Sequence, residues 1–227
     1  MTAEYMLAAI AVVMICFIVK GVRQGFLREV FGLLSSVIAL FLVAYLTPSV
    51  SGFLTEHTSL YSMISSKLYA TIGNSAGSLT DTSLQSAAIN SFSVPVIVKE
   101  ILLANNTSDG YSALLVSVFE DYIVGFLTRV MINILSLIII FMIIKILLKS
   151  ITSIFDIIDK IPVVHGVNRL LGALVGFSEG AIIICLFFLF MMIFTGDEIG
   201  QSFYGMVESD PILSFIYNNN IFLHFVL

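Results

Sequence analysis

The sequence predicts an all-α integral membrane protein with about four transmembrane helices, an interfacial amphipathic helix and a small helical outer segment. Of the 227 residues, 59% are hydrophobic and only 11% are charged, whereas a soluble domain of this size has about 25% charged residues. The mean hydropathy is +1.07. Too few polar side chains remain to cover a globule in water, so the excess apolar surface requires lipid.

Four apolar runs are long enough, or nearly so, to cross a hydrocarbon core of ~30 Å. The predicted spans are residues 3–22, 30–46, 125–146 and 170–194. Helices are expected because lipid offers no hydrogen-bond partners to the backbone and no run shows the two-residue alternation of a barrel. The only charge before the first run is Glu4, and its cations follow it, so we expect a retained span rather than a cleaved signal peptide.

The segments outside these spans differ in composition. Residues 48–122 are rich in Ser, Thr and Asn and form an insert in which short helices are predicted at 54–69, 94–103 and 112–122. The connector 145–169 has polar residues every three or four positions, which predicts an amphipathic interfacial helix that continues the third span. The tail 195–227 is acidic and then apolar.

Basic residues are segregated along the chain, although the net charge is −5. Seven of the ten Lys and Arg residues lie on the two short connectors. They are Lys20, Arg23, Arg28, Lys145, Lys149, Lys160 and Arg169. Because cytoplasmic loops of membrane proteins have an excess of Lys and Arg, both connectors are predicted to be cytoplasmic. Both termini, the insert 48–122 and the tail 195–227 are then extracytoplasmic.

Several classes of function find no support in the sequence. No basic stretch with interleaved aromatic residues suggests nucleic-acid binding. Cys16 and Cys185 both lie in apolar runs, so neither a disulfide framework nor a metal cluster is expected. The three histidines share no ligand spacing, and no nucleophile–base pair can be named. We therefore expect no cofactor, no metal and no enzymatic activity.

The first motif is the predicted turn between the first two spans. Gly21 and Gly25 would permit a tight reversal or a close helix contact. Arg23 and Arg28 could pair with anionic headgroups or with Glu29. A ligand site is the alternative, but the Walker spacing of a phosphate-binding loop is absent.

The second motif opens the fourth span after Arg169. Gly172, Gly176 and Gly180 recur every four residues, which gives one helix face almost without side chains. In lipid such a face lets another helix approach closely, since helix association there depends on van der Waals contact. The alternative is that these are chance glycines in a flexible helix.

Glu179 is the one charged residue inside the fourth span. An ionisable group at membrane depth is costly and is a candidate functional residue. Three interpretations are open: it pairs structurally with Arg28, Lys145 or Lys149; it has a solute- or proton-linked role; or the span is shallower and the carboxylate lies at the interface.

These two motifs resemble those of the colicin V production protein (CvpA) family. The first is similar to its G-x-[RK]-x-G-F-x-R-E turn and the second to its R-x-L-G-x-x-x-G-x-x-x-G span entry, over roughly residues 1–50 and 125–195. The matching residues are Gly21, Arg23, Gly25, Phe26, Arg28, Glu29, Arg169, Leu171, Gly172, Gly176 and Gly180. The chain departs from the family in its longer insert, in Glu179 where a basic residue is frequent, and in Asn168 where Asp often stands.

The resemblance implies a multi-pass protein of the bacterial cytoplasmic (inner) membrane with an accessory role in toxin production or export and in envelope homeostasis. It brings no catalytic residues. Expected partners are membrane lipids and either further copies of the chain or other membrane proteins such as a secretion system. The alternative is an oligomeric channel or transporter for a small solute or ion, with Glu179 facing a pore, although the spans offer few polar residues to line one. They are Ser35, Ser36, Asn133 and Ser136.

Overall fold

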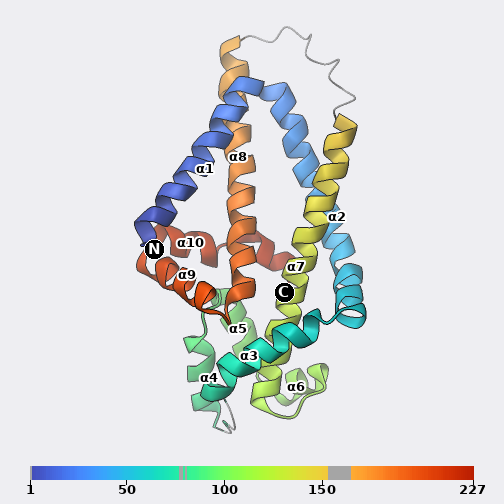
Figure 1. The fold of residues 1–227 in the computed structure, drawn as a ribbon, viewed down its shortest axis with the longest axis vertical. Coiled ribbons are helices and arrows are strands. Elements are labelled where there is room, and N and C mark those ends of the chain that lie inside the picture. The colour runs from blue at the N-terminus through green and yellow to red at the C-terminus, as the bar shows by residue number, and fades with distance from the viewer. Residues whose placement is uncertain (1, 77–78, 80, 153–164) are drawn as a thin grey trace. The chain divides into compact units, whose positions relative to one another are not determined.

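The computed structural model describes residues 2–76, 79, 81–152 and 165–227, and every regular element in these residues is a helix (Figure 1). Four helices are long and apolar enough to cross a membrane, over Ala3–Gln24, Leu33–His57, Phe119–Leu148 and Asn168–Phe194. The predicted all-α class with four membrane helices is confirmed. The chain is therefore a multi-pass membrane protein.

The long helices are α1 (Ala3–Gln24), α2 (Phe26–His57), α7 (Phe119–Thr152) and α8 (His165–Met191), and α8 ends in the 3-10 turn η2 (Met192–Phe194). The shorter ones are α3 (Leu60–Ala76), α4 (Thr82–Ser91), α5 (Val96–Ala104), α6 (Ser108–Leu114), α9 (Glu198–Ser209), α10 (Pro211–Asn218) and the 3-10 turn η3 (Ile221–Phe225).

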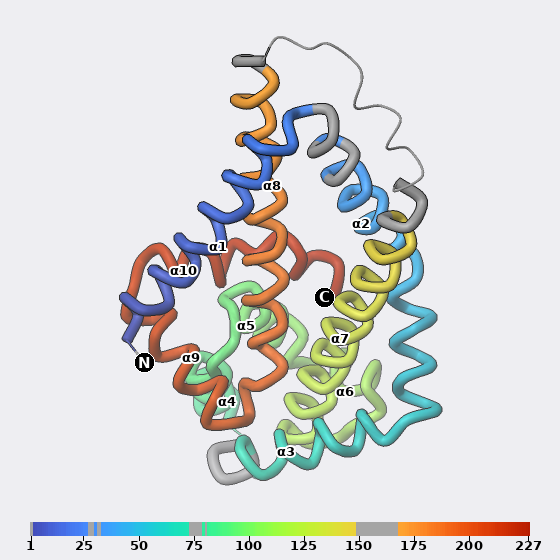
Figure 2. The backbone as a smooth tube through the Cα atoms, turned by 45° about the horizontal axis from the view of Figure 1, so that its top comes forward, coloured from blue at the N-terminus to red at the C-terminus, as the bar shows by residue number. Residues whose placement is uncertain are grey.

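The chain divides into two compact units, whose boundaries fall inside α2, α7 and α8. Unit 1 comprises Met1–Thr47 and Leu137–Phe187, and unit 2 comprises Pro48–Ser136 and Phe188–Leu227. In unit 1, α1 lies against α8 and crosses it, as the two views in Figures 1 and 2 both show. A single residue, Gly25, separates α1 from α2.

Unit 2 is built around the first half of α7. Its side chains Tyr122, Ile123, Leu127 and Met131 are almost completely buried. The Tyr122 hydroxyl donates a hydrogen bond of 2.9 Å to the carbonyl of Leu102 at the end of α5. Burial of these large side chains is the main source of stability for the short helices, which are too short to be stable alone.

A second aromatic cluster joins the end of α8 to the two helices that follow it. The Phe188 ring packs edge-on against Phe203 of α9, with centroids 5.3 Å apart. Tyr217 of α10 lies 6.2 Å from the Phe203 ring and 6.5 Å from the Phe188 ring. These contacts fold the segment after the fourth span back onto that span.

The helix α2 does not stop at Thr47 and Pro48, where the predicted second span ends. It runs through Pro48 to His57. Proline lacks an N–H group and disturbs a helix interior, so Pro48 removes the hydrogen bond that would reach the Ala44 carbonyl. Membrane helices tolerate such sites. The neighbouring Thr47 hydroxyl is buried and donates a hydrogen bond of 2.7 Å to the Val43 carbonyl.

The insert 48–122 is helical, with more helices than the sequence indicated. The helix α5 overlaps the predicted 94–103, α3 is shifted from the predicted 54–69, and α6 and the start of α7 replace a single helix at 112–122. The break before α7 follows from Leu115, whose φ of 58° lies in the left-handed region. The helix α4 was missed, although Asp81 caps it by accepting a 2.8 Å hydrogen bond from the Ser83 N–H.

The predicted interfacial helix 145–169 is described only at its ends. The helix α7 continues to Thr152 and α8 begins at His165, and the residues between them lie outside the described part of the chain.

The cap of α10 provides a first test of the fold. Asp210 accepts hydrogen bonds of 2.8 and 3.0 Å from the N–H groups of Ile212 and Leu213. Replacing Asp210 by Ala is expected to cost about 1 kcal/mol of unfolding free energy, whereas Asp210→Asn should keep the cap. Thermal unfolding in detergent measures both, and equal midpoints for the two variants would contradict the capping role.

Candidate functional site

The helices α1 and α8 touch through their backbones. A Cβ atom added to Gly21 would fall on the carbonyl group of Gly172, and one added to Gly172 would fall on the carbonyl oxygen of Gly21. A Cβ on Gly176 would meet the Phe17 carbonyl oxygen, and one on Gly180 would lie 3.0 Å from the Met14 sulfur. The repeated glycines of α8 therefore face α1 along two turns, at a distance that leaves no room for a side chain.

The turn between α1 and α2 is held by α8. Gly25 adopts φ 79°, a conformation that favours glycine, and its N–H donates a 2.9 Å hydrogen bond to the Gly21 carbonyl. The side-chain oxygen of Asn168 accepts a 2.8 Å hydrogen bond from the Phe26 N–H. Asn168 thus supplies a partner to one of the free N–H groups at the start of α2.

Next to the glycine contact, one carboxylate joins two lysines. Glu179 is 7% exposed. One of its oxygens lies 2.7 Å from the Lys20 ammonium of α1, and the other lies 3.1 Å from the Lys145 ammonium of α7. Lys145 also donates a 2.8 Å hydrogen bond to the buried hydroxyl of Ser36 in α2. We call Lys20, Ser36, Lys145 and Glu179 the charge cluster, and it includes one residue from each membrane helix.

The geometry offsets the cost of placing charges in membrane helices. A single ionised side chain at the centre of a span costs ~2.5–3.5 kcal/mol on insertion scales. Here each carboxylate oxygen accepts from a different ammonium, and the Lys20 ammonium also lies 5.7 Å from the centre of the Phe17 ring, within reach of a cation–π contact. The arrangement links four helices by charge-assisted hydrogen bonds.

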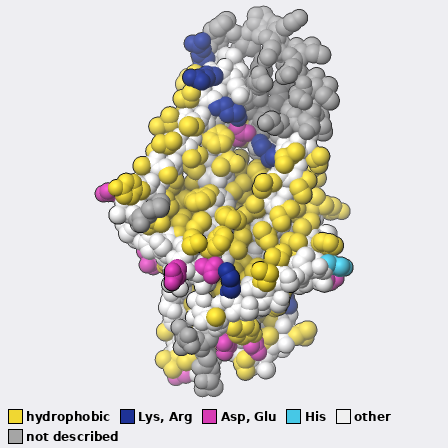
Figure 3. Space-filling view, in the orientation of Figure 1, with side chains coloured by type: hydrophobic (Ala, Val, Ile, Leu, Met, Phe, Trp, Pro, Cys, Tyr) yellow, Lys and Arg dark blue, Asp and Glu magenta, His cyan; other side chains and the backbone are white. Residues whose placement is uncertain are grey.

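Two of the remaining predicted residues, Arg23 and Arg169, lie at the exposed ends of α1 and α8. Arg23 is exposed in the last turn of α1, and Arg169 is exposed in the first turns of α8. Figure 3 shows Lys and Arg side chains gathered at the end of unit 1 where α1 finishes and α8 begins, beside a broad hydrophobic surface. The side chains of Arg28 and Glu29 lie outside the described part of the chain, as does that of Lys149.

Comparison with known proteins identifies the family. A family model described as "Colicin V production protein" matches residues 8–99 and 101–217. The chain belongs to the colicin V production protein family. The match also covers most of the insert 48–122, which contains neither of the two sequence motifs. A search of curated proteins and a search of solved structures each found no match.

Within this family member, sequence reasoning anticipated part of the charge cluster. Glu179 was singled out, and Lys145 was one of three partners considered. Lys20 was predicted only as one of the cations of the first connector, and Ser36 as one of few polar residues in a span. The position of Lys20 could have indicated this pairing. Lys20 directly precedes Gly21, which contacts the glycines of α8.

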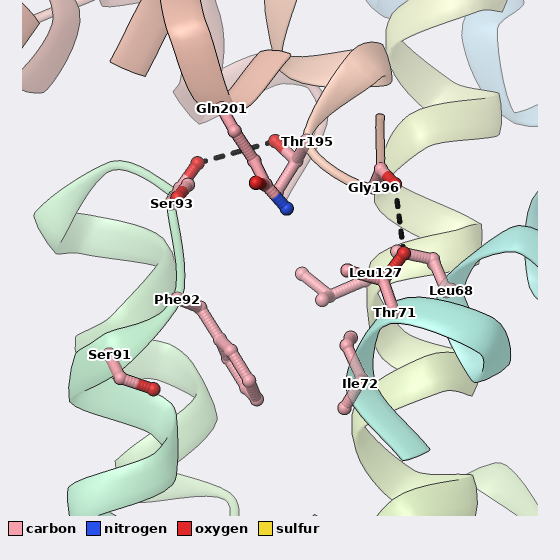
Figure 4. A pocket seen from close by; sticks show the side chains of 10 residues that line it. All are labelled: Leu68, Thr71, Ile72, Ser91, Phe92, Ser93, Leu127, Thr195, Gly196 and Gln201. Atoms are coloured by element: carbon pink, nitrogen blue, oxygen red, sulfur yellow. Dashed lines mark hydrogen bonds between the residues drawn. The ribbon is translucent and has the colours of Figure 1, made fainter. Parts of the chain in front are cut away.

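Unit 2 of this colicin V production family protein contains a separate pocket of about 180 Å³ (Figure 4). Hydroxyl groups tie its walls together: Thr71 donates to the Gly196 carbonyl at 2.8 Å and Thr195 to the Ser93 carbonyl at 3.3 Å. The Gln201 amide projects between these walls. None of the described residues that line the pocket is ionisable, so they offer hydrogen bonding and apolar contact.

Besides the Thr71 hydrogen bond, two further polar contacts attach α3 to the rest of unit 2. Lys67 forms an ion pair of 2.9 Å with Asp197, and the Tyr69 hydroxyl donates a 2.7 Å hydrogen bond to Asp121. Burial, together with the Asp121 carboxylate, raises the pKa of Tyr69 to about 12. The phenol therefore remains a hydrogen-bond donor at neutral pH. Among the described residues, no group of three His, Cys, Asp or Glu side chains could hold a metal ion.

The glycine contact predicts opposite effects for two matched substitutions. Gly176→Ala should destabilise the protein by about 1–3 kcal/mol, because the new methyl group would overlap the Phe17 carbonyl. Gly205→Ala in α9, where a Cβ would meet nothing within 4 Å, should stabilise it by up to about 1 kcal/mol. Thermal unfolding in detergent compares them, and a stable Gly176→Ala protein would show that the helices do not touch here.

Proposed function

We propose that this protein is an accessory protein of the bacterial cytoplasmic membrane that supports the production or export of a peptide toxin and helps to maintain the cell envelope. It acts by packing and partner binding, without enzymatic activity and without a cofactor. Its partners are membrane lipids and either further copies of the chain or other membrane proteins, such as those of a secretion system. Membership of the colicin V production protein family supports this proposal.

The contacts of Glu179 are the observation that favours a scaffold. Both carboxylate oxygens are engaged by ammonium groups from two other helices. A carboxylate in this arrangement fixes the positions of α1, α7 and α8, and each of its oxygens already has an ammonium partner.

The other polar residues that could line a pore are also engaged within the protein. Ser36 accepts from Lys145. Ser136 donates a 2.8 Å hydrogen bond to the Ile132 carbonyl of its own helix. Asn133 donates a 3.0 Å hydrogen bond to the carbonyl of Val226. Polar groups that are satisfied internally stabilise helix packing in lipid, which supports a structural role for these residues.

A channel or transporter is the second candidate, and one observation favours it. Three ionisable residues lie together in membrane helices, and such groups are common on ion and proton pathways. This candidate requires Glu179 to exchange its lysine partners for a solute or a proton during each cycle.

The proposed topology places both termini and the insert 48–122 outside the cytoplasm. In a background without Cys16 and Cys185, a cysteine at the exposed position Ser91 should react with a membrane-impermeant maleimide in spheroplasts. A cysteine at the exposed position Gln24 should react only after the membrane is opened. The reverse pattern of labelling would contradict the topology.

The scaffold proposal predicts that Glu179→Gln destabilises the protein, because two lysines lose their carboxylate. The cost should lie between the ~1 kcal/mol of an exposed ion pair and the 3–5 kcal/mol of a fully buried one, since Lys20 and Lys145 are partly exposed. Adding Lys145→Gln should restore part of the stability. Toxin export from cells should fall and recover in parallel with the amount of folded protein.

The transporter candidate predicts a different result from the same variants. Glu179→Gln would then remain folded and abundant but lose function, and vesicles containing the native protein would show a pH-dependent flux that vesicles containing the variant lack. That combination would overturn the scaffold proposal.

A further inference from the structure

The C-terminal segment of unit 2 has an unusual outward face. In α9 the outward side chains are mostly polar, including the exposed residues Ser202 and Glu208, with Ile199 as an exposed apolar exception, while Phe203 and Val207 are buried. In α10 and η3 the inward side chains are apolar too, but the outward face is also largely apolar. Its large exposed apolar side chains include Ile212 (59%), Phe215 (67%), Ile221 (55%) and Phe225 (42%). The exposed polar side chains among them are those of Asn219 and His224.

This segment is also free of charge. Residues 211–227 contain no Asp, Glu, Lys or Arg, and His224 is their one titratable imidazole. A helix that is apolar on all sides is buried in a core or in lipid, and an uncharged apolar surface would be poorly solvated in water. The missing cations also mean that anionic headgroups would gain no electrostatic attraction here.

Two contacts fix the depth of this segment relative to the membrane helices within unit 2. The ring of Tyr217 packs 6.5 Å from that of Phe188, which lies six residues, or ~9 Å, before the end of the fourth span at Phe194. The Val226 carbonyl accepts from Asn133, which lies within the apolar span of α7.

The depth of Tyr217 matches that of helices that lie in a membrane interface, whose apolar faces are buried by ~5–10 Å. We propose that α10 and η3 form an interfacial anchor, in which the outward side chains Ile212, Phe215, Ile221 and Phe225 contact lipid acyl chains. The anchor depends on apolar contact and not on anionic lipid. It goes beyond the proposed function, because it holds for a scaffold and for a transporter alike.

The natural sequence contains no tryptophan, so one introduced residue reports on a single position. Phe215→Trp places this reporter on the proposed anchor, and Ser202→Trp places it on the polar outward face of α9 as the matched control. Both replaced side chains are exposed, and Ile212→Trp provides a second reporter on the anchor. Each protein is reconstituted into phosphatidylcholine nanodiscs, with and without phosphatidylglycerol.

The anchor predicts that Trp at 215 emits at short wavelength, is quenched severalfold more strongly by brominated phosphatidylcholine than Trp at 202, and is protected from acrylamide. Trp at 202 should show the opposite behaviour, and phosphatidylglycerol should change neither. Acrylamide quenching of Trp at 215 equal to that at 202 would overturn the proposal. Protection of Trp at 215 from both quenchers, lost in nanodiscs that hold a single copy, would show that a second copy covers this face and would also overturn it.

Discussion

The backbone contact between α1 and α8 is the constraint on which the arrangement of unit 1 depends. Lipid tails are as apolar as most side chains, so apolar residues gain little by associating with each other in a membrane, and close van der Waals contact must hold the helices together. Gly21, Gly172 and Gly176 permit that contact. Lys20 and Glu179 each stand next to a glycine of the contact, and their charges meet because the two backbones do.

The charge cluster makes the packing of the membrane helices specific, although charged residues in a membrane are individually unfavourable. Apolar helices could pack at many rotations about their axes with similar energy. A carboxylate that must meet two ammonium groups favours a single one of these rotations. The hydrogen bond from Lys145 to Ser36 extends the same selection to α2. The glycines thus set how closely the helices approach, and Glu179 selects which faces meet.

The sequence was sufficient for the membrane class because hydropathy reports directly on the solvent that a segment requires. It was also informative about the glycine face, since a four-residue period places Gly172 and Gly176 on one side of a helix. It could not name Lys20 as a partner of Glu179, because pairing across 159 positions depends on helix rotation. The continuation of α2 past Pro48 was not predicted, because proline usually ends a helix but is tolerated inside membrane helices.

The hydrogen bond between Asn168 and Phe26 has a consequence for how the protein is made. The two residues lie 142 positions apart, and the ribosome completes α1 and α2 long before it reaches α8. During that interval the start of α2 lacks the side-chain amide of Asn168. The hairpin of α1 and α2 therefore enters the bilayer in an unfinished state, and the arrival of the last membrane helix completes it. Assembly of unit 1 in this respect waits for α8, and a chain released before residue 168 would leave its first two helices without the Asn168 side chain.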